Sequence, residues 1–267
     1  MGHDVVLSTI KKDYVRRLAD EGRRVDGRSF DEFRPVSIKT NVISKAEGSA
    51  DVRLGNTRVI AGVKMIVGSP YPDTPDKGAM ATGVELNPLA APEFEAGPPR
   101  EGAVELSRVV DRGIRESGLI DMKALCIEEG EKIWMVFIDV DILDHDGNLF
   151  DAASLAAVAA LSTAKVPISQ VDPEKEDYPL PMNPEVPIQT TFAKIGETIM
   201  ADPDLEEEGC MDVRLNIATD QNGNIRAMQK GGGSGAFTRE EILQVVAKAR
   251  DVQTSLRAEL ERALKDA

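Results

Sequence analysis

Apolar and polar residues alternate over several short runs in the first half of the chain, which predicts half-buried strands. These runs are 33–39, 49–54, 57–67 and 82–89, followed by 124–128 and 132–143. Gly55-Asn56 and Glu129-Gly130 stand between neighbouring runs and predict two hairpins. The second half repeats this pattern, with strands expected over 189–194, 198–201, 211–219 and 225–229.

Apolar residues also recur at helical spacing, which predicts helices between and after the strands. They are expected over 4–21, 101–116, 150–165 and 238–265. The helix over 150–165 is apolar on nearly every side, so other elements must cover most of its surface. Runs of strands followed by helices predict an α+β fold, with mixed sheets packed against helices, rather than a doubly wound parallel sheet.

A proline-rich connection divides the pattern in two. Residues 172–187 carry five prolines and five acidic residues, a composition that predicts an exposed loop. Strands and a long helix follow it, as they did before it. We therefore expect two βα domains, an N-terminal domain over 1–187 and a C-terminal domain over 188–267.

The charge of the chain limits how it can meet nucleic acid. The 267 residues include 32 Lys and Arg against 46 Asp and Glu, which gives a net charge of −14. Such a field repels a polyanion. Any RNA site must therefore be a local basic patch, or be shared with a more basic partner.

The cysteines and the N-terminus indicate where the protein resides. Cys126 and Cys210 belong to no CxxC motif and to no histidine pair, which indicates a reduced protein without structural zinc. The first residues contain no long apolar run, and the most apolar segment, 152–161, is too short to cross a membrane. We expect a cytoplasmic protein.

Three arginines stand out on the helix predicted over 101–116: Arg108, Arg112 and Arg115. At about 100° per residue they share one narrow stripe, while the apolar residues of this helix face away from it. A basic stripe on a packed helix can bind phosphate groups.

The alternative is a solvated face on which these arginines pair with neighbouring acids. The candidate acids are Glu105, Asp111 and Glu116. Exposed ion pairs of this kind are common and contribute little to stability. Arg115 in particular can pair with Asp111, four residues before it on the helix. Spacing alone favours this alternative slightly.

Five segments occur in the order and spacing of RNase PH-like proteins, and together they extend over almost the whole chain. They are RRVDGR at 23–28, EGSADVRLGNTRVIAGVK at 47–64, VELSRVVDRGI at 104–114, DHDGNLFDAASLAAVAAL at 144–161 and DPDLEEEGCMDVRLNIA at 202–218. The chain therefore resembles the phosphorolytic ribonucleases of the RNase PH superfamily. Further segments, YPDTPDKG at 71–78, GPP at 97–99 and DGNLFDAA at 146–153, resemble the non-catalytic subunits of the archaeal exosome ring.

Two departures from the active members of this family bear on catalysis. Active members carry two adjacent arginines before the Glu-Leu-Ser of the helix, where this chain has Glu101 and Gly102. They also cradle inorganic phosphate in a loop that here reads Asn148, Leu149 and Phe150. Phosphate is the nucleophile of phosphorolysis and must be held in line with the scissile bond. Compared with those members, this chain is expected to have no catalytic residues.

The resemblance implies a structural, RNA-contacting role in an exosome, which degrades RNA 3′-to-5′ by phosphorolysis. Such a subunit alternates with a catalytic RNase PH-like subunit in a hexameric ring, three of each, under a cap of RNA-binding subunits. Single-stranded RNA threads through the ring. Arg108 and Arg112 would hold phosphates of the RNA 3′ end beside the neighbour's active site, and Arg115 is a weaker candidate.

An acidic cluster in the second half argues for residual activity. It consists of Glu206, Glu207, Glu208 and Asp212. In active members, acidic residues near Glu206 and Asp212 serve proton transfer or metal binding. Charge runs are usually surface features, so the preferred interpretation is a solvated turn before a strand. His145, with His3 the only other histidine, is expected to be a turn residue, and no metal or cofactor is expected.

Two other functions compete with this interpretation. An active phosphate-dependent 3′-to-5′ exoribonuclease would need a phosphate site that the sequence does not reveal. A small-molecule phosphate-binding enzyme could use the glycine loop over 231–235, since a helix N-terminus can hold phosphate. That loop lacks the Lys-Ser/Thr of a P-loop and the spacing of a dinucleotide loop, so a flexible turn is the preferred interpretation.

Overall fold

A six-stranded sheet forms the first half of the fold, in a computed structural model that describes residues 2–266, with side chains described from residue 11 onward. Its strands are β1 (Val36–Thr40), β2 (Gly48–Leu54), β3 (Thr57–Gly68), β4 (Ala79–Leu86), β5 (Cys126–Glu128) and β6 (Lys132–Asp144). They follow the order β1-β2-β3-β6-β4, with β5 paired to β6. Only β4 and β6 run parallel in this sheet, so a helix, α2, is needed to carry the chain back between them.

A four-stranded antiparallel sheet forms the second half, in the order β10-β9-β11-β12. Its strands are β9 (Ile188–Ile195), β10 (Thr198–Ala201), β11 (Val213–Thr219) and β12 (Ile225–Gly231). Every residue of β11 is buried, because elements pack on both faces of this sheet. A small pair of strands, β7 (Lys165–Val166) and β8 (Tyr178–Pro179), lies outside the two main sheets.

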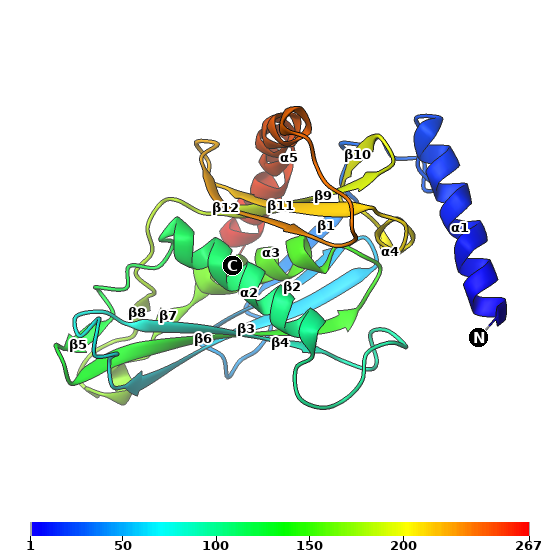
Figure 1. Cartoon of the computed structure of the whole chain (residues 1–267). Helices are drawn as coiled ribbons and strands as arrows, with labels where there is room; N and C mark the ends of the chain where they lie inside the picture. Colours follow the sequence, from blue (N-terminus) through cyan, green and yellow to red (C-terminus); the bar gives the residue numbers. More distant parts are fainter. Residues whose placement is uncertain (1, 267) are drawn as a thin grey trace.

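Two helices, α2 (Glu101–Ser117) and α3 (Leu149–Thr163), lie between the two sheets (Figure 1). α3 contacts β2 and β3 on one side and β9 on the other, and its residues 149–161 are all buried. This cover on both sides explains why its sequence is apolar all round. α2 contacts β4 and β12 and so also bridges the two sheets.

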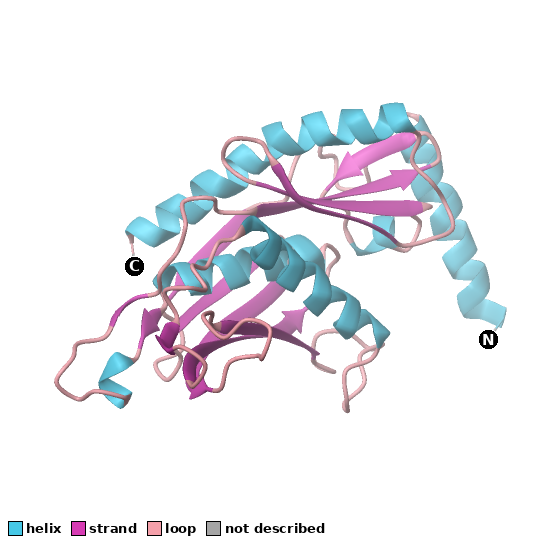
Figure 2. Cartoon of the chain, turned by 60° about the vertical axis from the view of Figure 1, so that its left-hand side comes forward, coloured by secondary structure: helices cyan, strands magenta, loops and turns pink. Residues whose placement is uncertain are grey.

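The other helices lie on the outside of the second sheet. α5 (Arg239–Lys265) runs along its outer face (Figure 2), where Val245 and Ala249 pack on Phe192 and Leu215. α1 (Gly2–Asp20) lies beside the short α4 (Leu205–Glu208) at the edge of the fold. No helix among residues 2–266 is long and apolar enough to cross a bilayer.

The predicted α+β fold is confirmed, and each of the four expected helices is present. The strand expected over 82–89 is displaced: β4 begins at Ala79, where it pairs with Met135, and ends before Pro88. A proline has no N–H for the ladder, which accounts for the early end. The short α4 and a single 3-10 turn after β7 were not expected from the pattern.

The segment 172–187 is not the wholly exposed connection that its composition predicts. Leu180 is buried against the main core, and Met182 forms a bridge with Ile120. Pairing of β8 with β7 holds this segment to the body of the protein. The division into domains over 1–187 and 188–267 stays a prediction.

Candidate functional site

The three arginines of the predicted stripe line one pocket on the surface of α2. The pocket has a volume of about 300 Å³, and Thr82 of β4 forms part of its wall. The apolar side of α2 is buried in the core through Leu106, Val109, Val110 and Ile114. Because this amphipathic helix is held by its apolar side, it presents Arg108, Arg112 and Arg115 together to solvent, as their spacing predicts.

Arg115 is the arginine of this set that pairs with an acid. Its Nε lies 2.9 Å from Oδ2 of Asp111, and its Nη2 lies 2.9 Å from Oδ1 of the same carboxylate. Nη2 also donates to the carbonyl of Met80 at 3.0 Å. The predicted pairing across four residues is therefore confirmed, and the charge of Arg115 is balanced in place.

Arg108 and Arg112 are exposed and have no carboxylate partner among the side chains from residue 11 onward. Nη1 of Arg112 donates to Oε1 of Gln229, a neutral amide on β12, at 3.1 Å. Within the same described part of the chain, no hydrogen bond or ion pair involves the Arg108 guanidinium. The ion pairing that the solvated-face alternative expects is therefore present for Arg115 and is not seen for Arg108 and Arg112 among the described side chains.

Glu105, three residues before Arg108, is bound by other residues. Its Oε1 lies 2.6 Å from Nη2 of Arg214 on β11 and 3.3 Å from Nε2 of Gln229. The Arg214 guanidinium stacks on the ring of Phe150 at 3.8 Å from its centroid. Burial lowers the pKa of Arg214, although Glu105 opposes this shift.

The segment that begins α3 contains no open cradle for phosphate. Asn148 is the N-cap of α3 and adopts a left-handed conformation with φ 52°. Its amide donates to Asp202 at 2.7 Å and to Asp151 at 2.8 Å, so both of its donors are used internally. Leu149 and Phe150 are buried. The side-chain donors of Asn148 are therefore already used within the protein, and Leu149 and Phe150 offer none.

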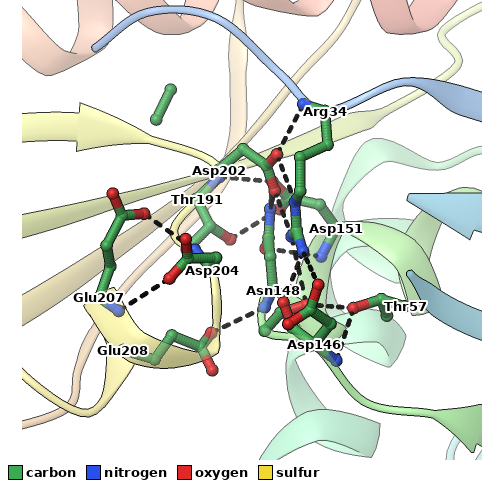
Figure 3. A network of polar contacts seen from close by, with 12 residues as sticks. Arg34, Thr57, Asp146, Asn148, Asp151, Thr191, Asp202, Asp204, Glu207 and Glu208 are labelled. Atoms are coloured by element: carbon green, nitrogen blue, oxygen red, sulfur yellow. Dashed lines mark hydrogen bonds and ion pairs between the residues drawn. The ribbon is translucent and has the colours of Figure 1, made fainter. Parts of the chain in front are cut away.

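A buried polar network surrounds this cap (Figure 3). Arg34, at the entry to β1, bonds the Asp202 carboxylate through Nε at 2.9 Å and Nη2 at 2.7 Å. Burial would raise the pKa of Asp202, but the hydrogen bonds and charge of Arg34 lower it overall. Oε1 of Glu208 accepts from the Asn148 N–H at 2.9 Å, and burial raises the pKa of Glu208 to about 7.

The acidic cluster is the predicted solvated turn only in part, because Glu206 is exposed and Asp212 partly exposed, whereas Glu207 is buried. Glu207 is buried against Arg24, whose Nε lies 2.8 Å from Oε1, and it completes the N-terminal capping box of α4. Glu206 and Asp212 bind two basic residues of α1, Lys11 at 3.0 Å and Arg16 at 2.8 Å. Each of these three carboxylates is therefore paired with a cation of the N-terminal segment.

The glycine loop is packed tightly rather than open. The N–H of Gly235 donates to the Asp212 carbonyl at 2.8 Å, and a Cβ on Gly233 would lie 2.0 Å from that carbonyl oxygen. Thr238 and Glu241 cap the start of α5 with a capping box, so the N–H groups of these two residues have partners. The expected turn into the last helix fits this geometry better than a phosphate cradle.

His145 stacks on Phe94 with the ring centroids 5.3 Å apart, and its Nδ1 accepts from the Gly147 N–H at 3.3 Å. Burial lowers the pKa of this imidazole. Across the described part of the chain, no group of three or more His, Cys, Asp or Glu residues is arranged to hold a metal ion.

The family models identify the chain. The model described as "3' exoribonuclease family, domain 1" matches residues 32–167, and the model described as "3' exoribonuclease family, domain 2" matches residues 185–252. The chain belongs to the 3′ exoribonuclease, or RNase PH, family. The resemblance inferred from five sequence segments is therefore confirmed.

Relatives in this family extend over nearly the whole chain. "Exosome complex component Rrp42" of Methanocella arvoryzae is 53% identical over 96% of this chain and 97% of its own length. The protein of the same name from Thermococcus gammatolerans is 52% identical over 94% of each chain.

Solved structures of the family share the fold. A structure described as "archaeoglobus fulgidus exosome with RNA bound to the active site" contains a chain that is 48% identical, with a TM-score of 0.91 over 95% of this chain and 99% of that one. A chain of an "Archaeal exosome core" is 45% identical, with a TM-score of 0.88 over 98% of this chain and 100% of that one. Rrp46 of rice, at 16% identity and a TM-score of 0.70 over 90% of this chain and 100% of that one, shares the fold alone.

Several residues of the site escaped sequence reasoning. The sequence alone predicts no role for Arg24, Arg34, Arg214 or Gln229. The hints for Arg24 and Arg214 were their places in two of the family segments, RRVDGR at 23–28 and DPDLEEEGCMDVRLNIA at 202–218. For Arg214 and Gln229 no local pattern exists, because their partners on α2 are more than a hundred positions away in the chain.

Proposed function

We propose that this chain takes the place in an archaeal exosome that Rrp42 takes in its relatives, as an RNA-binding subunit without a catalytic centre of its own. The proposal rests on one observation above all: Arg108 and Arg112 face the same pocket and keep their charges free of carboxylate partners in the described part of the chain. Identities near 50% over almost full length support membership of the complex.

Arg108 and Arg112 would bind RNA phosphates, because a guanidinium donates in a planar fork that matches phosphate oxygens. The two stand four residues apart on α2 and project from the same side of the helix. Arg115 is a weaker candidate because Asp111 already neutralises it. The pocket would thus bind the phosphate backbone of a single strand without sequence-specific contacts to the bases.

Catalysis would belong to the neighbouring RNase PH-like subunit. Phosphorolysis needs donors that hold inorganic phosphate in line with the scissile bond. In this chain Leu149 and Phe150 are buried where active members have such donors, and Glu101 and Gly102 stand where those members have arginines. No observation on this structure favours the alternative of an exoribonuclease active in its own right.

The proposed partners follow from the same resemblance. The chain would alternate with the catalytic subunit in a hexameric ring, three of each, with RNA-binding cap subunits above and single-stranded RNA passing through. The net charge of −14 would favour pairing with a more basic neighbour over self-pairing. The cytoplasmic location predicted from the sequence belongs to this proposal.

The first test is nucleoside diphosphate release from single-stranded RNA in phosphate buffer. We expect no release by this chain alone, and on mixing with the catalytic subunit a rate above that of the catalytic subunit alone. Release by this chain alone would contradict the proposal and support the exoribonuclease alternative.

The arginines can be tested separately through the salt dependence of RNA binding by the mixed complex. Replacing Arg108 or Arg112 by glutamine should make the negative slope of log affinity against log salt shallower by about 0.7. Each phosphate contact on a single strand contributes about that amount. Arg262→Gln, an exposed arginine of α5 paired with Glu259, is the matched control and should leave the slope unchanged. An equal slope in all variants would show that the arginines are only a solvated face.

A further inference from the structure

Three acids on α2 stand near the arginines that face the pocket, and one of them, Glu116, lines the pocket without an ion-pair partner among the described side chains. Glu105 precedes Arg108 by three residues, and Asp111 lies between Arg108 and Arg112. Residues three or four apart on a helix are close enough for ion pairs, so a free Glu105 would attract Arg108. In the structure Arg115 binds Asp111, and Arg214 binds Glu105.

Arg214 is built into the fold in a way that points it at Glu105. Its side chain is 8% exposed, places Cζ over the Phe150 ring, and donates through Nε to Oδ1 of Asn216 at 2.9 Å. These contacts leave Nη2 directed toward Glu105 at 2.6 Å. Glu105 is itself 39% exposed, so without Arg214 its charge would be free to attract Arg108, three residues further along the helix.

Gln229 links Glu105 to Arg112. Its Nε2 donates to Glu105, and its Oε1 accepts from Arg112. The amide therefore engages one N–H of the Arg112 guanidinium and adds no charge. The remaining N–H groups stay available for a phosphate, which binds best as a bidentate partner.

Gly231 is the part of the glycine loop that this arrangement requires. A Cβ on Gly231 would lie 2.5 Å from Nη2 of Arg214 and 2.9 Å from Oε1 of Glu105. Any larger residue would therefore push the two charged groups apart. The start of the glycine loop thus provides room for the Arg214–Glu105 pair.

We propose that Arg214 and Gln229 are positioning residues of the RNA site: Arg214 holds Glu105 away from the arginines, and Gln229 orients Arg112. This inference rests on the proposed RNA contact of Arg108 and Arg112. The class of ligand is the phosphate backbone of single-stranded RNA. Phe150 contributes indirectly, because its ring contacts the Arg214 guanidinium and orients it.

The experiment measures binding of a fluorescein-labelled oligoadenylate to the complex of this chain with its catalytic partner. Arg214→Met and Gln229→Leu are each expected to weaken binding about five-fold, the equivalent of about 1 kcal/mol. The double variant Arg214→Met/Glu105→Gln should bind within about two-fold of the wild type, because it removes the acid that Arg214 restrains. Lys230→Met, on the exposed neighbour of Gln229, makes the same charge change as Arg214→Met and should have no effect.

Rescue by Glu105→Gln separates positioning from a general structural role, since repacking around Phe150 would not depend on that carboxylate. Weak binding that persists in the double variant would overturn the inference. So would wild-type binding by Gln229→Leu, a variant that leaves the buried Arg214 in place.

If Arg112→Gln weakens binding while Arg214→Met and Gln229→Leu do not, the inference fails and the proposed function stands. If Arg108→Gln and Arg112→Gln both bind as wild type, the proposed RNA contact fails as well.

Discussion

Asp151 illustrates how strongly the fold changes the chemistry of a single carboxylate. It lies buried in the first turn of α3, where Thr191 donates to it through N–H at 2.8 Å and Oγ1 at 2.7 Å. Burial raises the pKa of Asp151 to about 7 in spite of these hydrogen bonds. The folded protein therefore keeps a proton on this group that the unfolded chain loses above about pH 4.

That difference gives a pH-dependent prediction for Asp151→Asn. In the wild type the raised pKa lowers stability as pH rises from about 4 to about 7, because charging is easier in the unfolded chain. The neutral variant lacks this penalty, so its stability relative to the wild type should grow over the same range, by at most about 1.4 kcal/mol per pH unit. Urea unfolding of both proteins between pH 5 and pH 8 measures this, and parallel pH profiles would contradict it. Glu208, whose pKa is also about 7, is present in both proteins and cancels in the comparison.

At the scale of an element, the turn between β11 and β12 is organised by one acid. Asp220 is fully buried and accepts from the N–H groups of Asn222 and Asn224, each at 2.9 Å, and from Nε of Arg226 at 2.9 Å. Burial would raise the pKa of Asp220, but these hydrogen bonds outweigh it and lower the pKa to about 2. Arg250 of α5 holds the same turn by donating to the carbonyl of Gly223 at 2.9 Å.

We expect Asp220→Asn to destabilise the protein by about 2 kcal/mol at neutral pH, the usual range for hydrogen bonds to a charged group. The lowered pKa of Asp220 contributes stability above about pH 4, and this contribution is lost as pH falls through about 2. The difference in unfolding free energy between the wild type and Asp220→Asn should therefore shrink over that range. Asp251→Asn on the exposed face of α5 is the matched control and should change little. Urea unfolding at pH 7 and below checks both variants, and an equal loss in the control would contradict the role of the turn.

At the scale of the whole molecule, buried arginines tie the beginning of the chain to its second half. Arg24 bonds Glu207 and also donates to the carbonyls of Ala201 at 2.9 Å and Asp202 at 2.8 Å. Arg34 binds the Asp202 carboxylate in the same region. The segment before β1 thus holds the end of β10 and the start of α4 in place, which links the two sheets at one edge.

Glu207→Gln should therefore destabilise the protein by about 3 kcal/mol, because it leaves the buried Arg24 charge without a counter-charge. Glutamine retains an acceptor oxygen, so the variant tests the charge rather than the capping contact. Glu206→Gln, on the next residue, breaks only an exposed pair with Lys11 and should cost less than about 1 kcal/mol. Chemical unfolding of the two variants compares them directly, and similar losses would refute the buried-pair argument.

The sequence by itself determined the alternation of strands, the α2 stripe and the burial of α3, because each follows from the spacing of residues close together in the chain. The resemblance to active family members also predicts that Leu149 and Phe150 stand where those members hold phosphate, and that prediction belongs to the proposed function. The α+β class followed from the order of elements, and the structure confirms it.

Only the tertiary structure decided which charges are free. Two of the acids near the arginines of α2 are paired: Asp111 with Arg115 on the same helix, and Glu105 with Arg214 on a distant strand. Spacing predicts only the first of these pairs. In the same way, the sequence predicts a solvated Glu207, whereas in the structure it forms a buried ion pair with Arg24, which is far away in the chain. The physical reason is that the partner and the burial of a charge depend on contacts across the fold, whereas periodicity reports only neighbours within a few residues.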